Sequence, residues 1–245
     1  MVERLSADEV LQLWERAERL GPTDRALVLL ARARRGRPEA EIEGMSIGQS
    51  EAALLELRQA TFGGSLVALE NCPDCRAFVE LTVEPSVLLS MAPSTVGVTT
   101  LSVDGWRVRF RVPRLVDLRA IEEEADPSRA RLLLLGRCLQ EVFDPSGEPV
   151  AVEQLPASLH EPIARAMDEA DPLAQLTLPL ECPSCRRAWD GELDVASFFW
   201  REISVLARRL LGEVHELASR YGWSESHILR LTEVRRHAYL EGRWA

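Results

Sequence analysis

The sequence predicts a mostly helical α+β fold that carries two β-hairpins ending in cysteine turns. The motif Cys-Pro-x-Cys occurs twice, as Cys72-Pro73-Asp74-Cys75 and as Cys182-Pro183-Ser184-Cys185. Alternating apolar residues flank both turns, a pattern typical of strands, whereas apolar residues elsewhere recur every three or four positions, as in helices. We therefore expect a zinc-ribbon-like pair of CPxC hairpin knuckles, a long α/β insertion between them and a helical C-terminus.

The cysteine spacing points to a metal. Two such turns supply the four thiolates that tetrahedral zinc takes, with Zn–S bonds of about 2.3 Å. The 106 residues between the two motifs do not prevent this, because closing so long a loop costs on the order of 4 kcal/mol. A structural zinc contributes roughly 10–16 kcal/mol in small peptides. The expected ligands of one structural zinc are Cys72, Cys75, Cys182 and Cys185.

A redox role for these cysteines fits the sequence less well. A redox pair is expected at the start of a helix in a thioredoxin-like βαβ context, and neither motif has that setting. The fifth cysteine, Cys138, lies in an apolar helical stretch and is expected in the core.

The helices before the first cysteine turn are defined by their ends. Ser6 and Glu9 form a capping box for a first helix that Gly21-Pro22 ends, and Thr23 is expected to cap a second, with Leu27, Leu30 and Ala31 inward. We expect residues 37–44 to be a linker. Ser46 then begins a helix that Gly63-Gly64 ends.

The insertion between the knuckles is expected to be mixed. Asp104-Gly105 is the turn of a β-hairpin, and residues 93–97 form a loop before it. A buried helix is expected from Ser128 to about Phe143, with Leu132 to Leu135 inward. An amphipathic helix is expected from Pro156 to Ala170.

The C-terminal region reads as three helices. The longest runs from Val195 to Tyr221 with Gly222 as its C-cap, and Ser224 and Thr232 begin two shorter ones, the last with Val234 inward. The expected segments are an N-terminal helical hairpin (residues 1–36), the first knuckle with its preceding helix (45–94), the inserted hairpin and helices (95–175), the second knuckle (176–195) and the C-terminal helices (196–245).

Composition argues against several functions. The net charge is −10 and all 29 basic residues are arginine, which excludes a phosphate-binding or Schiff-base lysine. Negative charge opposes binding to nucleic-acid backbones. There is no GxSxG, phosphate loop, GxGxxG or HExxH, so no enzyme is expected. Without a signal sequence or a long apolar run, we expect a cytoplasmic protein that does not enter membranes.

Several stretches of the sequence together carry a family resemblance. They are Ile47-Gly48-Gln49 through Thr61-Phe62-Gly63 into the first turn, Asp171-Pro172 before the second, Phe199-Trp200-Arg201-Glu202-Ile203, Tyr221-Gly222-Trp223-Ser224-Glu225, and Arg235 to Glu241. In combination they resemble the baseplate hub assembly chaperone-like proteins of contractile phage tails and phage-tail-like contractile injection systems. In those proteins Gly often follows the second cysteine of the turn, where this chain has Arg76 and Arg186.

The resemblance implies a non-enzymatic structural or assembly component of an injection-system baseplate. It would bind other baseplate, hub, spike or wedge proteins within a larger assembly, either in the cytoplasm or in a particle assembled there. Trp223 and the last helix would then dock on a partner, or Trp223 instead staples that helix to the chain's own core. The alternative is a zinc-ribbon nucleic-acid-binding or regulatory protein, for which Arg76, Arg186, Arg187 and Trp189 offer a basic, aromatic face.

Overall fold

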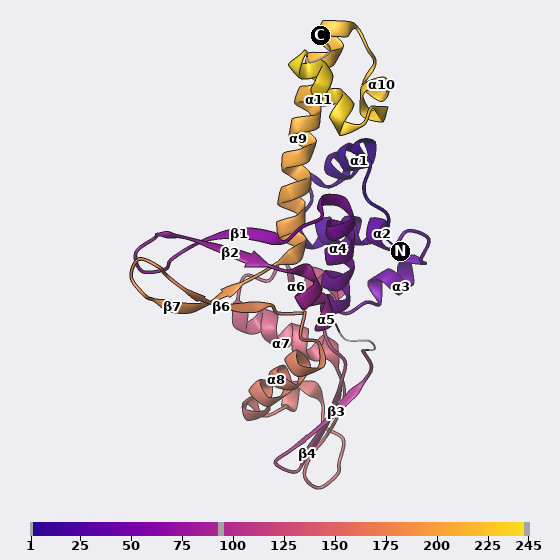
Figure 1. Cartoon of the computed structure of the whole chain (residues 1–245). Helices are drawn as coiled ribbons and strands as arrows, with labels where there is room; N and C mark the ends of the chain where they lie inside the picture. The colour runs from indigo at the N-terminus through magenta and orange to yellow at the C-terminus, as the bar shows by residue number, and fades with distance from the viewer. Residues whose placement is uncertain (1, 93–95, 243–245) are drawn as a thin grey trace.

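The computed structural model describes residues 2–92 and 96–242. A long helix, α9, is the axis of the molecule: other helices pack along it, two hairpins project from its base, and a small α/β lobe lies below (Figure 1). The helices are α1 (Ala7–Ala17), α2 (Pro22–Ala33), α3 (Glu39–Glu43), α4 (Ile47–Phe62), α5 (Pro85–Ser90), α6 (Leu115–Ile121), α7 (Pro127–Cys138), α8 (His160–Ala170), α9 (Val195–Tyr221), α10 (Glu225–Arg230) and α11 (Glu233–Glu241). The strands are β1 (Leu66–Asn71), β2 (Phe78–Val83), β3 (Thr99–Val103), β4 (Trp106–Phe110), β5 (Leu139–Phe143), β6 (Thr177–Glu181) and β7 (Ala188–Glu192).

The main core forms where α1, α2, α4 and α9 pack together. Side chains from these helices that are wholly buried include Leu29, Leu30, Leu54, Leu55 and Phe199. The same core continues into the base of both hairpins through Leu66 and Leu176. The hairpins are therefore anchored to the helices at one end only.

The capping signals place most helix ends correctly. Ser6 with Glu9 and Ser46 with Gln49 form capping boxes. The expected helix from Val195 to Tyr221 is confirmed, with Gly222 in the left-handed conformation at φ 70°. Ser224 and Thr232 cap α10 and α11 as expected.

Trp223 packs on its own chain. Its ring stacks on Tyr221 with centroids 4.7 Å apart and meets Tyr239 edge-on at 4.8 Å. These contacts join the end of α9 to α11. Of the two roles considered for Trp223, the structure shows the staple.

The α/β lobe has a separate core. Strands β3, β4 and β5 form an antiparallel sheet, and α7 and α8 cover it. Asp104 and Gly105 both have positive φ, 50° and 79°, so the expected hairpin turn is confirmed. Val108, Phe110, Cys138 and Ile163 are the wholly buried side chains of this core.

The helix expected from Ser128 to Phe143 is wrong in its second half. Helix α7 ends at Cys138 and the next five residues form β5, whose residue Leu139 pairs with Phe110. Pairing with β4 buries Leu139 and Val142, which a helical continuation would not place beside the sheet. The helix is also less buried than expected: Leu132 and Leu133 are 51% and 45% exposed. Leu135 and Cys138 are the buried residues of α7, and Leu134 packs against the core while partly exposed.

Smaller corrections concern the other helices. Gly21, not Thr23, is the N-cap of α2, because Pro22 occupies the first helical position, where its missing N–H costs nothing. Ala31 is exposed, and Ala26 and Leu29 face the core in its place.

Two further expectations about local structure also change. The expected linker at 37–44 contains the short helix α3, and Val234 is 80% exposed on α11. The loop expected at 93–97 lies partly outside the described residues. Within the described part of the chain, no helix combines the length and apolar character needed to cross a membrane.

Candidate metal centre

The first cysteine turn closes the hairpin of β1 and β2. These strands are antiparallel, with Asn71 opposite Phe78 in the last pair before the turn. The Cys72 amide donates to the Ala77 carbonyl at 2.9 Å, and the Arg76 amide donates to the Cys72 carbonyl at 3.0 Å. The tight turn thus places both thiols of the motif at its tip.

The second turn repeats this geometry between β6 and β7. The Cys182 amide donates to the Arg187 carbonyl at 2.8 Å, and the Arg186 amide donates to the Cys182 carbonyl at 2.9 Å. Here Glu181 is opposite Ala188 in the last strand pair. Two motifs more than one hundred residues apart in the sequence therefore form the same turn.

Both turns need a left-handed residue after the second cysteine. Arg76 has φ 59° and Arg186 has φ 62°, a region that residues with a Cβ atom enter at a cost of roughly 1–2 kcal/mol. Glycine has no such cost. The turn conformation is therefore imposed by the hairpin and the clustered thiols, not by the preference of these residues.

The two turns meet face to face at the outer end of the hairpins (Figure 1). The sulfur of Cys72 lies 3.6 Å from that of Cys185, and the sulfur of Cys75 lies 3.5 Å from that of Cys182. All four sulfurs lie within 4.8 Å of one another. The four cysteines are free thiols, and these separations are far longer than a disulfide bond of about 2.05 Å.

The sulfur arrangement fits a tetrahedral ion. With metal–sulfur bonds of about 2.3 Å, the edges of a tetrahedron of sulfurs are about 3.8 Å long. The shorter cross-hairpin separations, 3.5 and 3.6 Å, are close to this value. Four soft thiol donors at this spacing suit zinc, which is bound by four cysteines in structural sites.

Electrostatics also favour a cation among the sulfurs. The backbone amide of Cys185, directed at Cys182, lowers the pKa of the Cys182 thiol to about 6. The amide of Arg187 favours the thiolate of Cys185, but partial desolvation by the neighbouring sulfurs and hydrogen bonds with the other three thiols outweigh it and raise the pKa of Cys185 to about 12. Four neighbouring sulfurs cannot all be ionised unless a positive ion lies between them.

The residues around the thiols pack against them and connect the two turns. Cys72 and Cys182 are buried, whereas Cys75 and Cys185 are exposed. Val79, Ala77 and Trp189 pack against the buried pair, and Arg187 of one turn lies 3.8 Å from Asp74 of the other. A tetrathiolate ion would have no open coordination position, so it would hold the hairpins together without activating water.

The remaining candidate residues lie elsewhere. Cys138 is in the core of the α/β lobe, as expected, and burial raises its thiol pKa to about 11. His237 on α11 lies 3.5 Å from the Glu213 carboxylate of α9 and takes no part in the thiol cluster. Across the described residues, the group of cysteine, histidine and acidic side chains spaced for a metal ion is the cluster at the two turns.

Two buried carboxylates at helix starts were missed by sequence reasoning. Asp171 accepts a hydrogen bond from the Gly48 amide in the first turn of α4 at 2.9 Å. Glu51 accepts one from the Val195 amide at the start of α9 at 3.0 Å. Gly48 and Asp171 both belong to stretches that carry the family resemblance, but nothing local in either stretch indicates that the two meet.

Comparison with known proteins identifies a family. The model of the family described as T4 bacteriophage base plate protein matches residues 35–200. This span begins just before α3, ends in the first turns of α9 and contains all four clustered cysteines. No curated protein and no solved structure matches the chain.

Proposed function

Because the chain belongs to the family of T4 bacteriophage base plate proteins, we propose that it is a non-enzymatic structural or assembly component of the baseplate of a phage-tail-like contractile injection system. The family match carries this proposal, since it covers more than half of the chain and includes both cysteine hairpins. The closed character of the thiol cluster supports a structural role for the site, because a tetrathiolate centre has no position for a substrate.

The proposal includes one structural zinc held by Cys72, Cys75, Cys182 and Cys185. Its support is the convergence of the four sulfurs within 4.8 Å of one another and the preference of zinc for a set of four thiolate donors. Zinc bound in this way would lock two hairpins that are otherwise joined to the helices only at their bases. The locked pair would then be a rigid arm.

The proposed partners are other baseplate proteins, including hub, spike or wedge components. The outer face of the first hairpin supports contacts with proteins, because it exposes large apolar side chains: Val67 is 51% exposed, Leu69 63% and Phe78 72%. Leu69 and Phe78 stand opposite Glu80 and Asn71 in the strand register, so they share one face of the arm with Val67. We propose that the injection particle containing this chain assembles in the cytoplasm.

Purification from producing cells tests this function. The tagged chain, expressed with its native neighbouring genes, should sediment with tube, sheath and spike proteins identified by mass spectrometry. Nuclease treatment should not release it. Retention on a DNA column that falls steeply with salt, without any tail protein in the fraction, would overturn the baseplate function and favour the nucleic-acid-binding alternative.

A further inference from the structure

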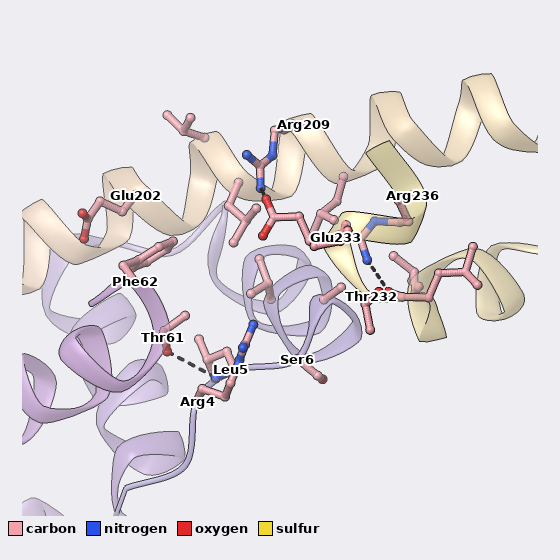
Figure 2. Close-up of a pocket in the computed structure, with 18 of the residues that line it drawn as sticks. Arg4, Leu5, Ser6, Thr61, Phe62, Glu202, Arg209, Thr232, Glu233 and Arg236 are labelled. Carbon is pink, nitrogen blue, oxygen red and sulfur yellow. Dashed lines mark hydrogen bonds and ion pairs between the residues drawn. The ribbon is translucent and has the colours of Figure 1, made fainter. Parts of the chain in front are cut away.

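A groove lies beside α9, and none of the four clustered cysteines lines it. It has a volume of about 1080 Å³. Figure 2 shows α9 along one wall, the N-terminal segment with α1 and the end of α4 along the other, and α10 and α11 at one end. The groove also reaches Val67 on β1, so it is continuous with the apolar face of the hairpin arm.

The groove offers apolar side chains to a partner. Val67, Val205 and Val234 come from three different elements and are 51%, 68% and 80% exposed. Leu206 and Phe62 also line the groove and are half-buried. Apolar side chains from separate elements that line one open groove are typical of a binding surface, whereas single exposed apolar residues are ordinary.

The acidic groups of the groove are already paired. Glu202 is held by Arg58, with an N–O distance of 2.7 Å, and Glu233 is held by Arg209 at 2.7 Å. Arg236, which lines the groove, is 2.7 Å from Glu213, which does not. Among the described residues that line the groove, these pairs leave no acidic side chain without a cation.

Two arginines of the groove remain uncompensated. Arg4 and Arg201 are exposed, and neither forms an ion pair within the described residues. Arg201 only lies over the ring of Phe198, 5.9 Å from its centroid. The groove thus presents positive charge that no acidic side chain in the described part of the chain neutralises, although the net charge of the chain is −10. This positive charge favours a partner segment that carries acidic side chains.

We propose that this groove binds an amphipathic helix of another baseplate protein, with its apolar face on Val67, Val205 and Val234 and acidic residues at its edge facing Arg4 and Arg201. A helix is the natural occupant because one apolar face with charged edges matches an apolar floor with a charged rim. A second copy of this chain is the competing occupant, and the crosslinked partner distinguishes the two. The inference rests on the proposed function in taking the partner from the baseplate.

Photo-crosslinking in producing cells tests the proposal on the full chain. A photoreactive phenylalanine analogue replaces Val205 in the groove, and in a control strain it replaces Leu211, which lies on the same helix outside the groove. The expected result is one dominant crosslink from position 205 to an amphipathic segment with acidic residues in a second protein, identified by peptide mass spectrometry. Position 211 should not give that product.

Charge variants make the test specific. Arg201→Glu should lower the yield of the crosslink about tenfold, as a loss of about 1.4 kcal/mol would, because it places like charges in contact. Arg208→Glu, an exposed arginine of α9 outside the groove, should leave the yield unchanged. Equal thermal unfolding of the two variants would exclude misfolding as the cause.

The inference fails if position 205 gives no crosslink, crosslinks only to a second copy, or reaches a segment without acidic residues. It also fails if Arg201→Glu and Arg208→Glu reduce the yield equally. Sedimentation with tail proteins in any of these cases would leave the proposed baseplate function standing. Conversely, position 205 could crosslink as expected, but to a protein that does not belong to a tail. That result would overturn the proposed baseplate function and still support the groove as a binding site for an acidic amphipathic helix.

Discussion

Glu51 on α4 accepts a hydrogen bond from the backbone amide of Val195, the first residue of α9, at a distance of 3.0 Å. The carboxyl is buried, and burial, reinforced by the charge of Asp194, raises its pKa from 4.5 to about 8. A carboxylate at a helix N-terminus normally stabilises the free N–H groups and the helix dipole. Here the same group joins the starts of two core helices that are far apart in sequence.

The first prediction is a dependence of stability on pH through Glu51. Between pH 4.5 and about 8 the folded chain keeps a proton that the unfolded chain has released, so the free energy of unfolding falls as pH rises. The slope from this group is at most roughly 1.4 kcal/mol per pH unit. Glu51→Gln keeps an oxygen acceptor but cannot titrate. The free energy of unfolding of this variant, measured by urea unfolding, should therefore depend less on pH between about pH 5 and 8.

The matched control for that prediction is Glu56→Gln. Glu56 lies on the same helix, half exposed, and pairs with Arg34 at the surface, so its loss should cost at most about 1 kcal/mol and preserve the slope of the wild-type profile. Identical profiles for Glu51→Gln and Glu56→Gln would contradict the assignment.

The second prediction concerns the thiol cluster. The purified, reduced protein should hold one zinc ion per chain by elemental analysis. Cys72→Ser should remove the metal and lower the free energy of unfolding by roughly 4 kcal/mol or more, the range typical of losing a structural metal. Cys138→Ser, a buried cysteine of the other core, should keep the full metal content. Full zinc content in Cys72→Ser would exclude the four-thiol site.

The third prediction exploits the backbone strain after each second cysteine. Arg76 has φ 59° and no ion pair within the described residues, so Arg76→Gly removes strain without breaking a charge interaction. We expect stabilisation by about 1 kcal/mol in thermal unfolding of the zinc-bound protein. Arg76→Ala retains a Cβ atom and should show no gain. If the two variants unfold at the same temperature, the left-handed turn is not a source of strain.

The parts of the fold that follow local rules are predictable from the sequence. Helix α9 begins at Val195 and ends at Tyr221 because Asp194 accepts from the Ser197 amide and Gly222 takes the left-handed conformation. The two cysteine hairpins are equally local, since each turn is closed by bonds between neighbouring residues. The meeting of the two turns is a long-range contact, between Cys72 and Cys185 and between Cys75 and Cys182. It was predictable only because four thiolates in two matched motifs suit a single metal ion.

Features set by contacts between distant residues were not predictable in this way. The apolar run that contains Leu139 and Val142 fits either a helix or a strand, and only pairing with β4 decides for β5. The apolar side chains of Leu132 and Leu133 suggest core positions. Only one face of α7 packs against the lobe, however, and both leucines lie on the exposed side of the helix. The hydrogen bond from the Val195 amide to Glu51 joins residues 144 positions apart, and no local sequence pattern predicts it.

The final prediction tests the contact between Gly48 and Asp171. A Cβ atom on Gly48 would lie 2.0 Å from Asp171 Oδ1, so Gly48→Ala should displace the carboxylate that caps α4. We expect a loss of roughly 2–4 kcal/mol, the sum of overpacking and a broken buried hydrogen bond. Gly212→Ala is the control. Gly212 is also helical and has open space around it, so this variant should gain about 0.5–1 kcal/mol in its free energy of unfolding.

A double-mutant cycle measured by urea unfolding tests whether the two positions are coupled. Asp171→Ala should cancel part of the Gly48→Ala loss, with a coupling of at least about 1 kcal/mol. Strictly additive losses would show that the clash with Asp171 is not what requires glycine at position 48.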